Sequence, residues 1–224
     1  MTPLYTNRNS KIKSNLAYLA GLIGADGSLE TKKPFITIAS ADRQFLEKQV
    51  APLIVNVTRR RIRVFMDRSA NVYKLRMYDR KLWSSLVKRY RIPCGAKSRI
   101  VRPPLMLTND ERLQYLQGWL DGEGWIEILR VRAKKLNRYP RIGFKVRSKS
   151  IRNWIRRTLK ERGVPVRTYD RVDESFGIWI NGTRASELFL RNVGFGYAPK
   201  NAALRKLIEK CRGNVSAKIR TGFR

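Results

Sequence analysis

The sequence predicts an α+β protein built from two copies of an αββαββα repeat, related to each other by a pseudo-twofold axis. Hydrophobic residues make up 42% of the 224 residues, which is enough to form a folded core. The same order of helical and strand patterns occurs twice along the chain. Between the two copies lies the stretch RIPCGAKSRIVRPPL, whose prolines and glycine are typical of a connection.

The first repeat is expected at residues 1–100. Asn15 can cap a helix that ends at Gly27, and a hairpin with a KKP turn then leads into the strand FITIAS. Asp42 opens a second helix, which Pro52 either kinks or ends. The strands RRRIRVFMD and VYKLRMY and the helix RKLWSSLVKRY complete this repeat.

The second repeat is expected at residues 109–211, after a linker at 101–108. Its helical patterns are DERLQYLQGWLDGEG, SIRNWIRRTLKERG and RASELFLRNVG, and its strand patterns are WIEILRVRA, PRIGFKVRS, VPVRTYDR and SFGIWIN. Residues 212–224 are basic and poor in apolar side chains, which predicts a mobile C-terminal tail that can also contact phosphate.

The chain is strongly basic along its whole length. Its 49 lysines and arginines exceed its 17 acids, giving a net charge of +32. Residues 1–105 hold 22 basic and 6 acidic residues and residues 106–224 hold 27 and 11, so each half carries +16. A surface of this charge favours a polyanion as partner. We therefore expect both halves to contact nucleic acid.

Several classes of protein are excluded by the side chains that are present. The chain has no histidine, which excludes histidine-based nucleases, Ser–His and Cys–His hydrolases, and zinc fingers with histidine ligands. Cys94 and Cys211 fit neither a CxxC metal site nor a disulfide framework, which indicates a reducing compartment. The longest apolar run, at 16–25, is shorter than the ~20 residues that span a bilayer. We expect a soluble cytoplasmic protein without membrane contact, associated with the nucleoid if the host is prokaryotic.

The opening helix of each repeat carries a stripe of small residues and ends in an acid followed by glycine. In the first helix Ala20, Gly21 and Gly24 lie on one face, and Gly118 takes the place of Gly21 in the second. Small residues allow two helix backbones to approach closely. Packed in parallel about the pseudo-twofold axis, the helices would form a central interface with both terminal acids at one end.

Those two acids, Asp26 and Glu123, point to a metal site. A helix C-terminus carries about half a negative charge, so an acid there costs ~0.3–1 kcal/mol. A divalent cation bound between the carboxylates would remove this penalty. Hard oxygen ligands suit Mg²⁺, and two or more such ions can stabilise the attacking and leaving oxygens of a phosphodiester. The sequence therefore predicts metal-assisted hydrolysis of a nucleic-acid backbone.

At this point the chain resembles a known family. LAGLIGADG at residues 19–27 is similar to the LAGLIDADG motif, with Gly24 in place of its first acid, and LQGWLDGEG at 116–124 is a looser second copy. In element order, residues 12–210 resemble the single-chain, two-motif LAGLIDADG homing endonucleases, similar to those encoded in archaeal introns. The first acid of that motif usually has a capping or structural role, so the change at Gly24 leaves activity possible.

The resemblance implies a divalent-metal enzyme that cuts both strands of a long DNA site, acting as a monomer with pseudo-dimeric architecture. Asp26 and Glu123 would bind the metal, with the carbonyls of Ala25 and Gly122 as further ligands. Family members place basic residues near the scissile phosphates. The matches are Lys97 and Lys200, which follow equivalent turns in the two repeats, although either lysine could instead contact the DNA backbone or lie on plain surface.

The strands are expected to contact DNA. Basic residues alternate with apolar ones along them, so each sheet would have one basic face suited to the major groove, and the two sheets would form a DNA-binding saddle. The candidate contact residues are Lys32, Lys33, Arg59, Arg61, Arg63, Lys74, Arg76, Arg141, Lys145, Arg147, Arg167, Tyr169 and Arg171. For any one arginine, a phosphate contact or a solvated position is favoured over base recognition.

Three functions remain open on the sequence alone. The leading hypothesis is a site-specific double-strand DNA endonuclease whose target is an intron-insertion sequence. The second is a maturase that binds its own intron RNA with the same basic scaffold. The third is a DNA-binding regulator that does not cleave. Both motif acids are present, which favours cleavage.

Overall fold

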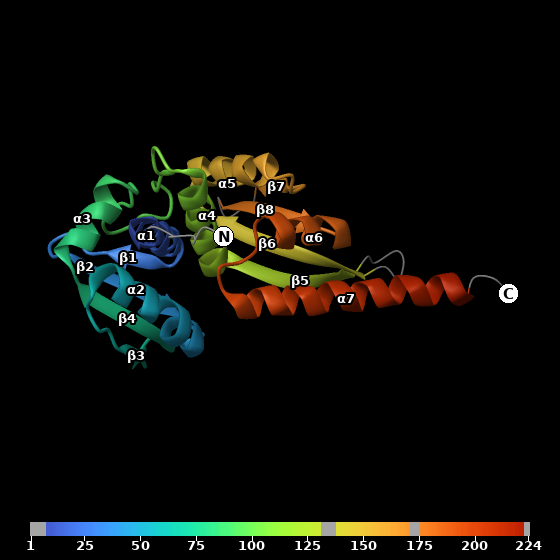
Figure 1. Ribbon diagram of the computed structural model, residues 1–224, viewed down its shortest axis with the longest axis horizontal. Coiled ribbons are helices and arrows are strands. Elements are labelled where there is room, and N and C mark those ends of the chain that lie inside the picture. Colours follow the sequence, from blue (N-terminus) through green and yellow to red (C-terminus); the bar gives the residue numbers. More distant parts are fainter. Residues whose placement is uncertain (1–7, 131–137, 171–174, 222–224) are drawn as a thin grey trace, which may run out of the picture. The chain divides into compact units, whose positions relative to one another are not determined.

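The computed structural model describes residues 8–130, 138–170 and 175–221. The chain divides into two compact units, residues 1–122 (unit 1) and 123–224 (unit 2). Each unit contains a four-stranded antiparallel sheet with helices packed on it (Figure 1). The element order αββαββα is present in both repeats, so the predicted α+β fold is confirmed.

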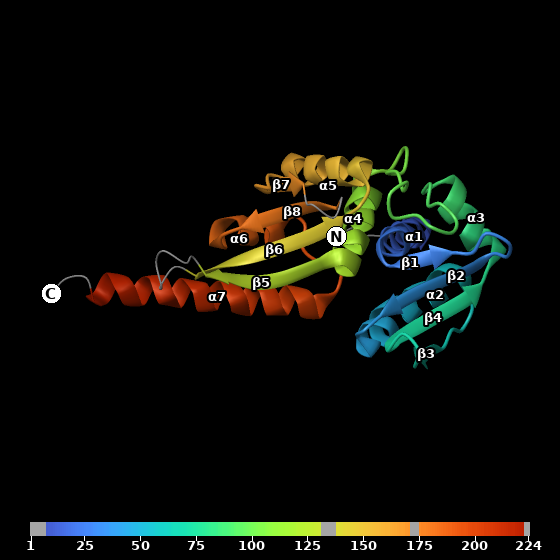
Figure 2. The same cartoon turned by 180° about the vertical axis from the view of Figure 1, so that it is seen from behind.

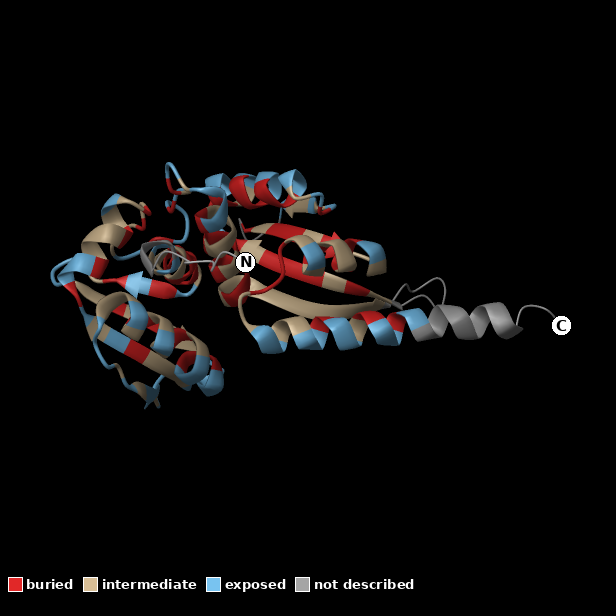
Figure 3. Cartoon of the chain, in the orientation of Figure 1, coloured by how far each residue is buried: buried red, intermediate tan, exposed pale blue. Residues whose placement is uncertain are grey.

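Unit 1 holds the first repeat. Its elements are α1 (Arg8–Ala25), β1 (Gly27–Leu29), β2 (Phe35–Ser40), η1 (Phe45–Val50), α2 (Ala51–Thr58), β3 (Val64–Asp67), β4 (Val72–Tyr78), α3 (Arg80–Lys88) and most of α4 (Asn109–Glu123). The sheet order is β1-β2-β4-β3. Alternate residues of β2 and β4, such as Ile36, Ile38 and Leu75, are fully buried beneath the helices, as period-two alternation requires (Figure 3).

Unit 2 holds the second repeat after its opening helix α4, followed by an additional helix. Its elements are β5 (Gly124–Arg130), β6 (Arg138–Val146), α5 (Lys149–Glu161), β7 (Arg167–Asp170), β8 (Phe176–Asn181), α6 (Thr183–Asn192) and α7 (Ala198–Thr221). The sheet order, β5-β6-β8-β7, is that of the first sheet. Ile142, Phe144 and Ile178 are buried against the helices, and α7 runs along β5 and β6 (Figure 2).

The structure differs from expectation at the ends of three segments. The first helix begins at Arg8, so Asn15 lies inside it, because nothing in RNSKIKS breaks a helix. Residues 198–221 form α7, where we expected Lys200 to follow a turn and a mobile tail to begin at 212. Pro199 lies in the first turn of α7, where a proline needs no hydrogen-bond partner, so it does not interrupt the helix.

The boundary between the units also lies later than the predicted linker at 101–108. The second motif helix, α4, groups with the first repeat as far as Gly122, because its glycine face packs on α1. In the second helical segment, residues 45–50 form one wide π-helical stretch and Pro52 lies at the start of α2. No helix among the described residues is long and apolar enough to cross a membrane.

Candidate metal and nucleic-acid site

The two motif helices, α1 and α4, pack backbone against backbone in unit 1. A Cβ atom added to Gly21 would lie 2.0 Å from the carbonyl oxygen of Tyr115, and one added to Gly118 would lie 2.1 Å from that of Tyr18. Backbone atoms cannot move away from such a contact, so only glycine fits at either position. A Cβ atom added to Gly24 would lie 3.0 Å from the ring of Trp119, and Ala20 is fully buried. Three of the four predicted interface residues, the glycines, therefore lie where the two motif helices pack.

Asp26 lies at the end of this helix pair. A Cβ atom on Gly122 would be 3.3 Å from Oδ2 of Asp26 and 2.6 Å from Cβ of Ala25. Three of the predicted metal-site residues therefore lie together in unit 1, and the fourth, Glu123, is the next residue along the chain. The Asp26 side chain is exposed and that of Glu123 is half-buried. The side chain of Asp26 is thus accessible to solvent.

Lys97 occupies a different position from either alternative that the sequence left open. Its side chain is 9% exposed, and its Nζ donates to the carbonyl oxygens of Gly24 at 2.7 Å and Ala25 at 3.0 Å, as well as to that of Ile23. The ammonium group therefore neutralises the negative end of α1. Lys97 therefore offsets part of the cost that the sequence predicts for an acid at this helix end, through contacts that span more than 70 residues.

Lys200 takes an analogous position within unit 2. Its Nζ donates to the carbonyl oxygen of Gly124 at 2.9 Å, just after the acid of the second motif, and lies 5.5 Å from the ring centre of Phe195. Lys200 is half-buried. Each lysine thus lies against the end of one motif sequence, as their equivalent positions in the two repeats suggested. The role of either lysine in catalysis stays a prediction.

A buried tyrosine–aspartate contact in the helix pair was missed from the sequence. The hydroxyl of Tyr18 on α1 donates to Oδ2 of Asp121 on α4 at 2.7 Å, and both side chains are buried. Burial, followed by the negative charge of Asp121, raises the pKa of Tyr18 well above its usual value. Asp121 stands at the motif position that Gly24 occupies in the first repeat. The sequence did show that only the second motif has an acid at this position. It did not show which group that acid contacts.

The residues present are suited to Mg²⁺. Among the described residues there is no cluster of three or more acidic, histidine or cysteine side chains. A magnesium ion commonly binds one or two carboxylates and completes its shell with water and substrate phosphate, so Asp26 and Glu123 are a sufficient protein contribution. The carbonyl of Ala25, a predicted ligand, already accepts a bond from Lys97 but has a second lone pair.

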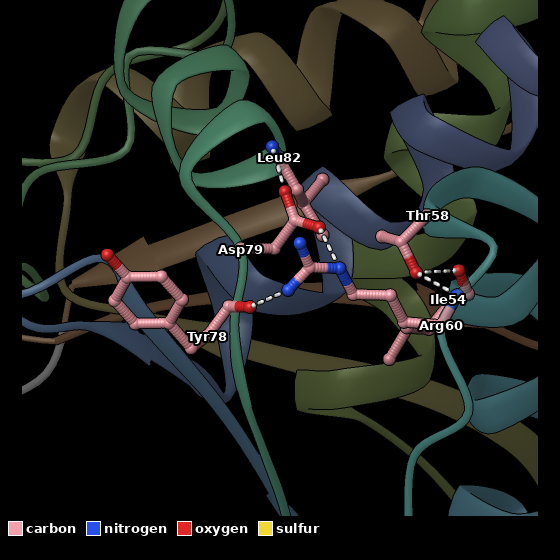
Figure 4. Close-up of polar contacts among 6 residues, drawn as sticks. All are labelled: Ile54, Thr58, Arg60, Tyr78, Asp79 and Leu82. Atoms are coloured by element: carbon pink, nitrogen blue, oxygen red, sulfur yellow. Dashed lines mark hydrogen bonds and ion pairs between the residues drawn. The ribbon is translucent and has the colours of Figure 1, made fainter.

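The arginine run before β3 does not form the predicted basic strand face. β3 begins only at Val64, and Arg59 ends α2 in a left-handed conformation with φ of 62°. Arg60 is held in place by Asp79, with Nε and Oδ2 3.4 Å apart, and donates from Nη1 to the carbonyl of Tyr78 at 2.8 Å (Figure 4). Asp79 in turn caps α3 by accepting from the backbone N–H of Leu82. This anchor fixes the segment as an irregular connection.

Arg59, Arg61 and Arg63 remain exposed on that connection. Their side chains can therefore contact phosphate. They extend from an irregular segment and not from alternate positions of a strand. Lys32 and Lys33 are likewise exposed, on the turn before β2.

On the solvent face of the first sheet the cations are paired with acids. Lys74 lies 2.5 Å from Asp67, and Arg76 lies 2.5 Å from Glu30 and over the ring of Phe35 at 4.2 Å. The hydrogen bond from Lys74, and then one from Ser69, hold the pKa of Asp67 well below its usual value. Lys74 and Arg76 share one face, opposite the buried Leu75, as the sequence predicted.

The equivalent face of the second sheet is aromatic as well as basic. Arg141 is only 13% exposed; its Nε donates to Asn181 at 3.0 Å, and its guanidinium lies 4.0 Å over the ring of Trp179. The ring of Tyr169 packs 3.9 Å from that of Trp179. Arg141 and Tyr169, both predicted DNA contacts, thus pack against Trp179 within unit 2.

The remaining candidates of unit 2 lie nearer to solvent. Lys145 is half-buried on the face of β6 that carries Arg141, and Arg147 and Arg167 are exposed. Arg171 lies outside the described residues.

Comparisons with known proteins agree with this fold. Residues 13–82 match the family described as LAGLIDADG-like domain. The structure is similar to that of I-DmoI in complex with DNA and Ca, with a TM-score of 0.61 and 19% identity over 87% of this chain and 98% of that one. It is similar to I-DmoI in complex with DNA and Mn, with a TM-score of 0.58 and 18% identity over 83% and 99% of the two chains.

A third similar structure is full-length DUF199/WhiA from Thermatoga maritima. Its TM-score is 0.62 and its identity 12%, over 97% of this chain and 63% of that one. No curated protein matches the sequence.

The family match covers the first motif and most of the first repeat, while the fold likeness extends over both repeats. Residues 13–82 thus match the LAGLIDADG-like domain family, and the chain shares the two-repeat fold of I-DmoI.

Proposed function

We propose that this protein is a metal-dependent, site-specific double-strand DNA endonuclease whose target is an intron-insertion sequence. The observation that carries the proposal is the position of the Asp26 carboxylate beside Gly122, immediately before Glu123. This contact brings the acid of the first motif to the end of the second motif helix. The structures of homing endonuclease I-DmoI with its target DNA, some in the presence of Mg or Mn, support the proposal through their shared fold.

In this proposal Asp26 and Glu123 hold one or more divalent ions, which would stabilise charge on the scissile phosphate and activate water. Lys97 keeps the last turn of α1, and with it Asp26, in a fixed position through its carbonyl contacts. Lys200 does the same for the chain at Gly124. Mg²⁺ is the proposed ion, because the protein ligands are all oxygen atoms.

The exposed cations supply the affinity for duplex DNA. Arg61, Arg63 and the turn lysines 32 and 33 in unit 1, with Arg147 and Arg167 in unit 2, can each neutralise a phosphate. Because both motifs are on one chain, the protein is proposed to act as a monomer on DNA. The same exposed cations are suited to a second polyanion, the protein's own intron RNA.

The test is end-sequencing of a plasmid library after incubation with protein and Mg²⁺. The library carries candidate intron-insertion junctions and random inserts. We expect cuts at one long sequence, lost by at least about 100-fold in Asp26→Asn and Glu123→Gln. Asp110→Asn and Glu161→Gln are matched controls, since both acids are exposed and lie outside the site. Cleavage that survives in Asp26→Asn would refute the proposed metal site.

A non-cleaving DNA-binding function is the second candidate. One observation favours it: the fold is shared with DUF199/WhiA, whose name does not describe an endonuclease. The two functions separate in one experiment, because a regulator would select one DNA sequence with equal affinity with and without Mg²⁺ and leave both strands intact.

A further inference from the structure

Unit 2 contains a cavity of 710 Å³ at the edge of its sheet. Residues from β6, β7 and β8 and from the last turn of α5 line it, including Tyr139, Lys160, Arg167, Trp179, Asn181 and Gly182. Its volume falls within the roughly 300–1,000 Å³ that small-molecule sites occupy. None of the proposed cleavage residues lines this cavity.

Contacts behind the cavity hold its aromatic wall in place. Trp179 lies between the ring of Tyr169, 3.9 Å away, and the guanidinium of Arg141, at 4.0 Å. Gly177 makes this arrangement possible, because a Cβ atom there would lie 1.8 Å from the Tyr169 ring. Arg141 is also held by Glu127 at 3.3 Å. The wall is therefore preorganised and needs little ordering when a ligand binds.

The polar groups of the cavity are suited to an anion with a hydrogen-bonding edge. Lys160 and Arg167 are exposed at its rim, and no described carboxylate forms an ion pair with either of them. The Oδ1 atom of Asn181 accepts the bond from Arg141, which makes its Nδ2 the donor end of the amide. Gly182 precedes α6 and offers no side-chain cap, so the positive end of that helix adds to the potential.

We propose that this cavity binds one nucleotide that lies outside a base-paired stack. Its base would stack on the ring of Tyr139 against the edge of Trp179. Arg167 and Lys160 would contact its phosphate, and Asn181 would donate to a ring nitrogen or carbonyl of the base. Aromatic rings with adjacent cations are the usual means of binding unpaired nucleotides. This site goes beyond the proposed cleavage function and does not require it.

The experiment compares two short labelled strands of equal length and charge. One carries a single adenine flanked by abasic positions, and the other is abasic throughout. Binding to the full-length protein is measured by fluorescence anisotropy at raised salt, which weakens phosphate contacts. We expect the adenine strand to bind roughly 5- to 150-fold more tightly, the range for one stacked base. Equal affinity for the two strands would overturn the proposal.

Variants connect the preference for adenine to the cavity. Tyr139→Ala should remove it and Tyr139→Phe should keep it, because the phenyl ring still stacks. Arg167→Gln should weaken both strands equally. Tyr78→Ala is the matched control, since that exposed ring lies on the other sheet. A full adenine preference in Tyr139→Ala would overturn the proposal. Because the wild-type comparison needs no variant, a misfolded Tyr139→Ala protein would not prevent the test.

Three forms of the adenine probe separate the sources of the nucleotide. They are a ribose strand, a deoxyribose strand and a duplex with one extrahelical adenine, each paired with its abasic counterpart. An adenine preference in any pair supports the site, and the largest preference identifies its source. Asp26→Asn should keep this preference while losing cleavage, and Tyr139→Ala should do the reverse. Failure of one proposal is thus distinguishable from failure of the other.

Discussion

The two repeats keep equivalent residues in different surroundings. Lys97 is almost fully buried and donates to three carbonyls of α1, whereas Lys200 is half-buried and donates to one carbonyl after α4. In the sheets, by contrast, the more exposed cation is in the first repeat. Arg76 of the first is 47% exposed, whereas Arg141 of the second is 13% exposed. The lysines occupy equivalent positions in the two repeats, whereas Arg76 lies on β4 and Arg141 on β6, which are not equivalent strands of the two sheets. Packing decides which of these cations are fixed.

The two repeats thus differ in which of their parts are held in place by packing. The first repeat has the more firmly held acid-bearing helix and the more exposed of these two sheet arginines. The second has a sheet face fixed by aromatic rings, with a cavity at its edge. Three pairs of substitutions and one single substitution would break or sharpen this comparison.

The largest effect is expected at the glycines of the motif helices. Gly118→Ala places a Cβ atom 2.1 Å from the carbonyl oxygen of Tyr18, so we expect a loss of about 3 kcal/mol or more in the free energy of unfolding. Gly24→Ala meets only the Trp119 side chain, at 3.0 Å, and should cost about 1 kcal/mol. Urea unfolding measures both losses. Equal losses would show that the helix pair has no tolerant position at Gly24.

The lysines should differ next. Lys97→Met leaves three carbonyls of α1 without their buried charged donor, and we expect a loss of about 2–3 kcal/mol. Lys200→Met removes one half-buried contact and should cost about 1 kcal/mol. Thermal unfolding of each variant beside wild type checks the order. If Lys200→Met were the more destabilising variant, the end of the first motif would not be the more firmly held of the two.

The sheet arginines should separate stability from binding. Arg141→Ala should cost about 1–2 kcal/mol, because it removes contacts to Asn181, Glu127 and Trp179. Arg76→Ala should cost less than about 1 kcal/mol, because its ion pair is exposed. DNA binding is measured as the slope of the logarithm of the binding constant against the logarithm of the salt concentration (the salt slope). Arg76→Ala should lower the size of this slope by about 1, and Arg141→Ala should leave it unchanged. Equal salt slopes for the two variants would contradict the difference between the sheets.

The smallest effect concerns alkaline pH and unit 1. Burial raises the pKa of Tyr90 to about 12, from an ordinary value of 10. The unfolded tyrosine loses its proton near pH 10 while the folded one keeps it to about pH 12, so stability falls as pH rises through that window. Tyr90→Phe should make the fall shallower. Urea midpoints measured from pH 9 to 11.5 test this, and an unchanged slope would exclude Tyr90 as a contributor.

The repeats were predictable from the sequence because local patterns specify them. Alternation in VYKLRMY correctly placed Lys74 and Arg76 opposite Leu75. The same rule failed in RRRIRVF, because a distant residue, Asp79, holds Arg60 in an irregular connection. Alternation describes a strand only where a neighbouring strand pairs with it.

The site was predictable in its residues more than in its contacts. The position of Asp26 beside Gly122 follows from glycine spacing in the two motifs. The carbonyl contacts of Lys97 and the Tyr18–Asp121 bond span 72 to 103 residues, and no local pattern specifies them. The helix at 198–221 was missed because Gly196 and Pro199 suggested a turn, although a proline in the first turn of a helix is permitted.

The contact between α1 and α4 sets a rule for anyone building chimeras from this protein. A junction in the proline-rich connection would separate Gly21 from the Tyr115 carbonyl against which it fits. Residues 18–25 and 115–122 form one packing unit that must be kept together, although nearly a hundred residues separate them in the sequence. Recombination that exchanges both together keeps the fit, and exchange of either one alone does not.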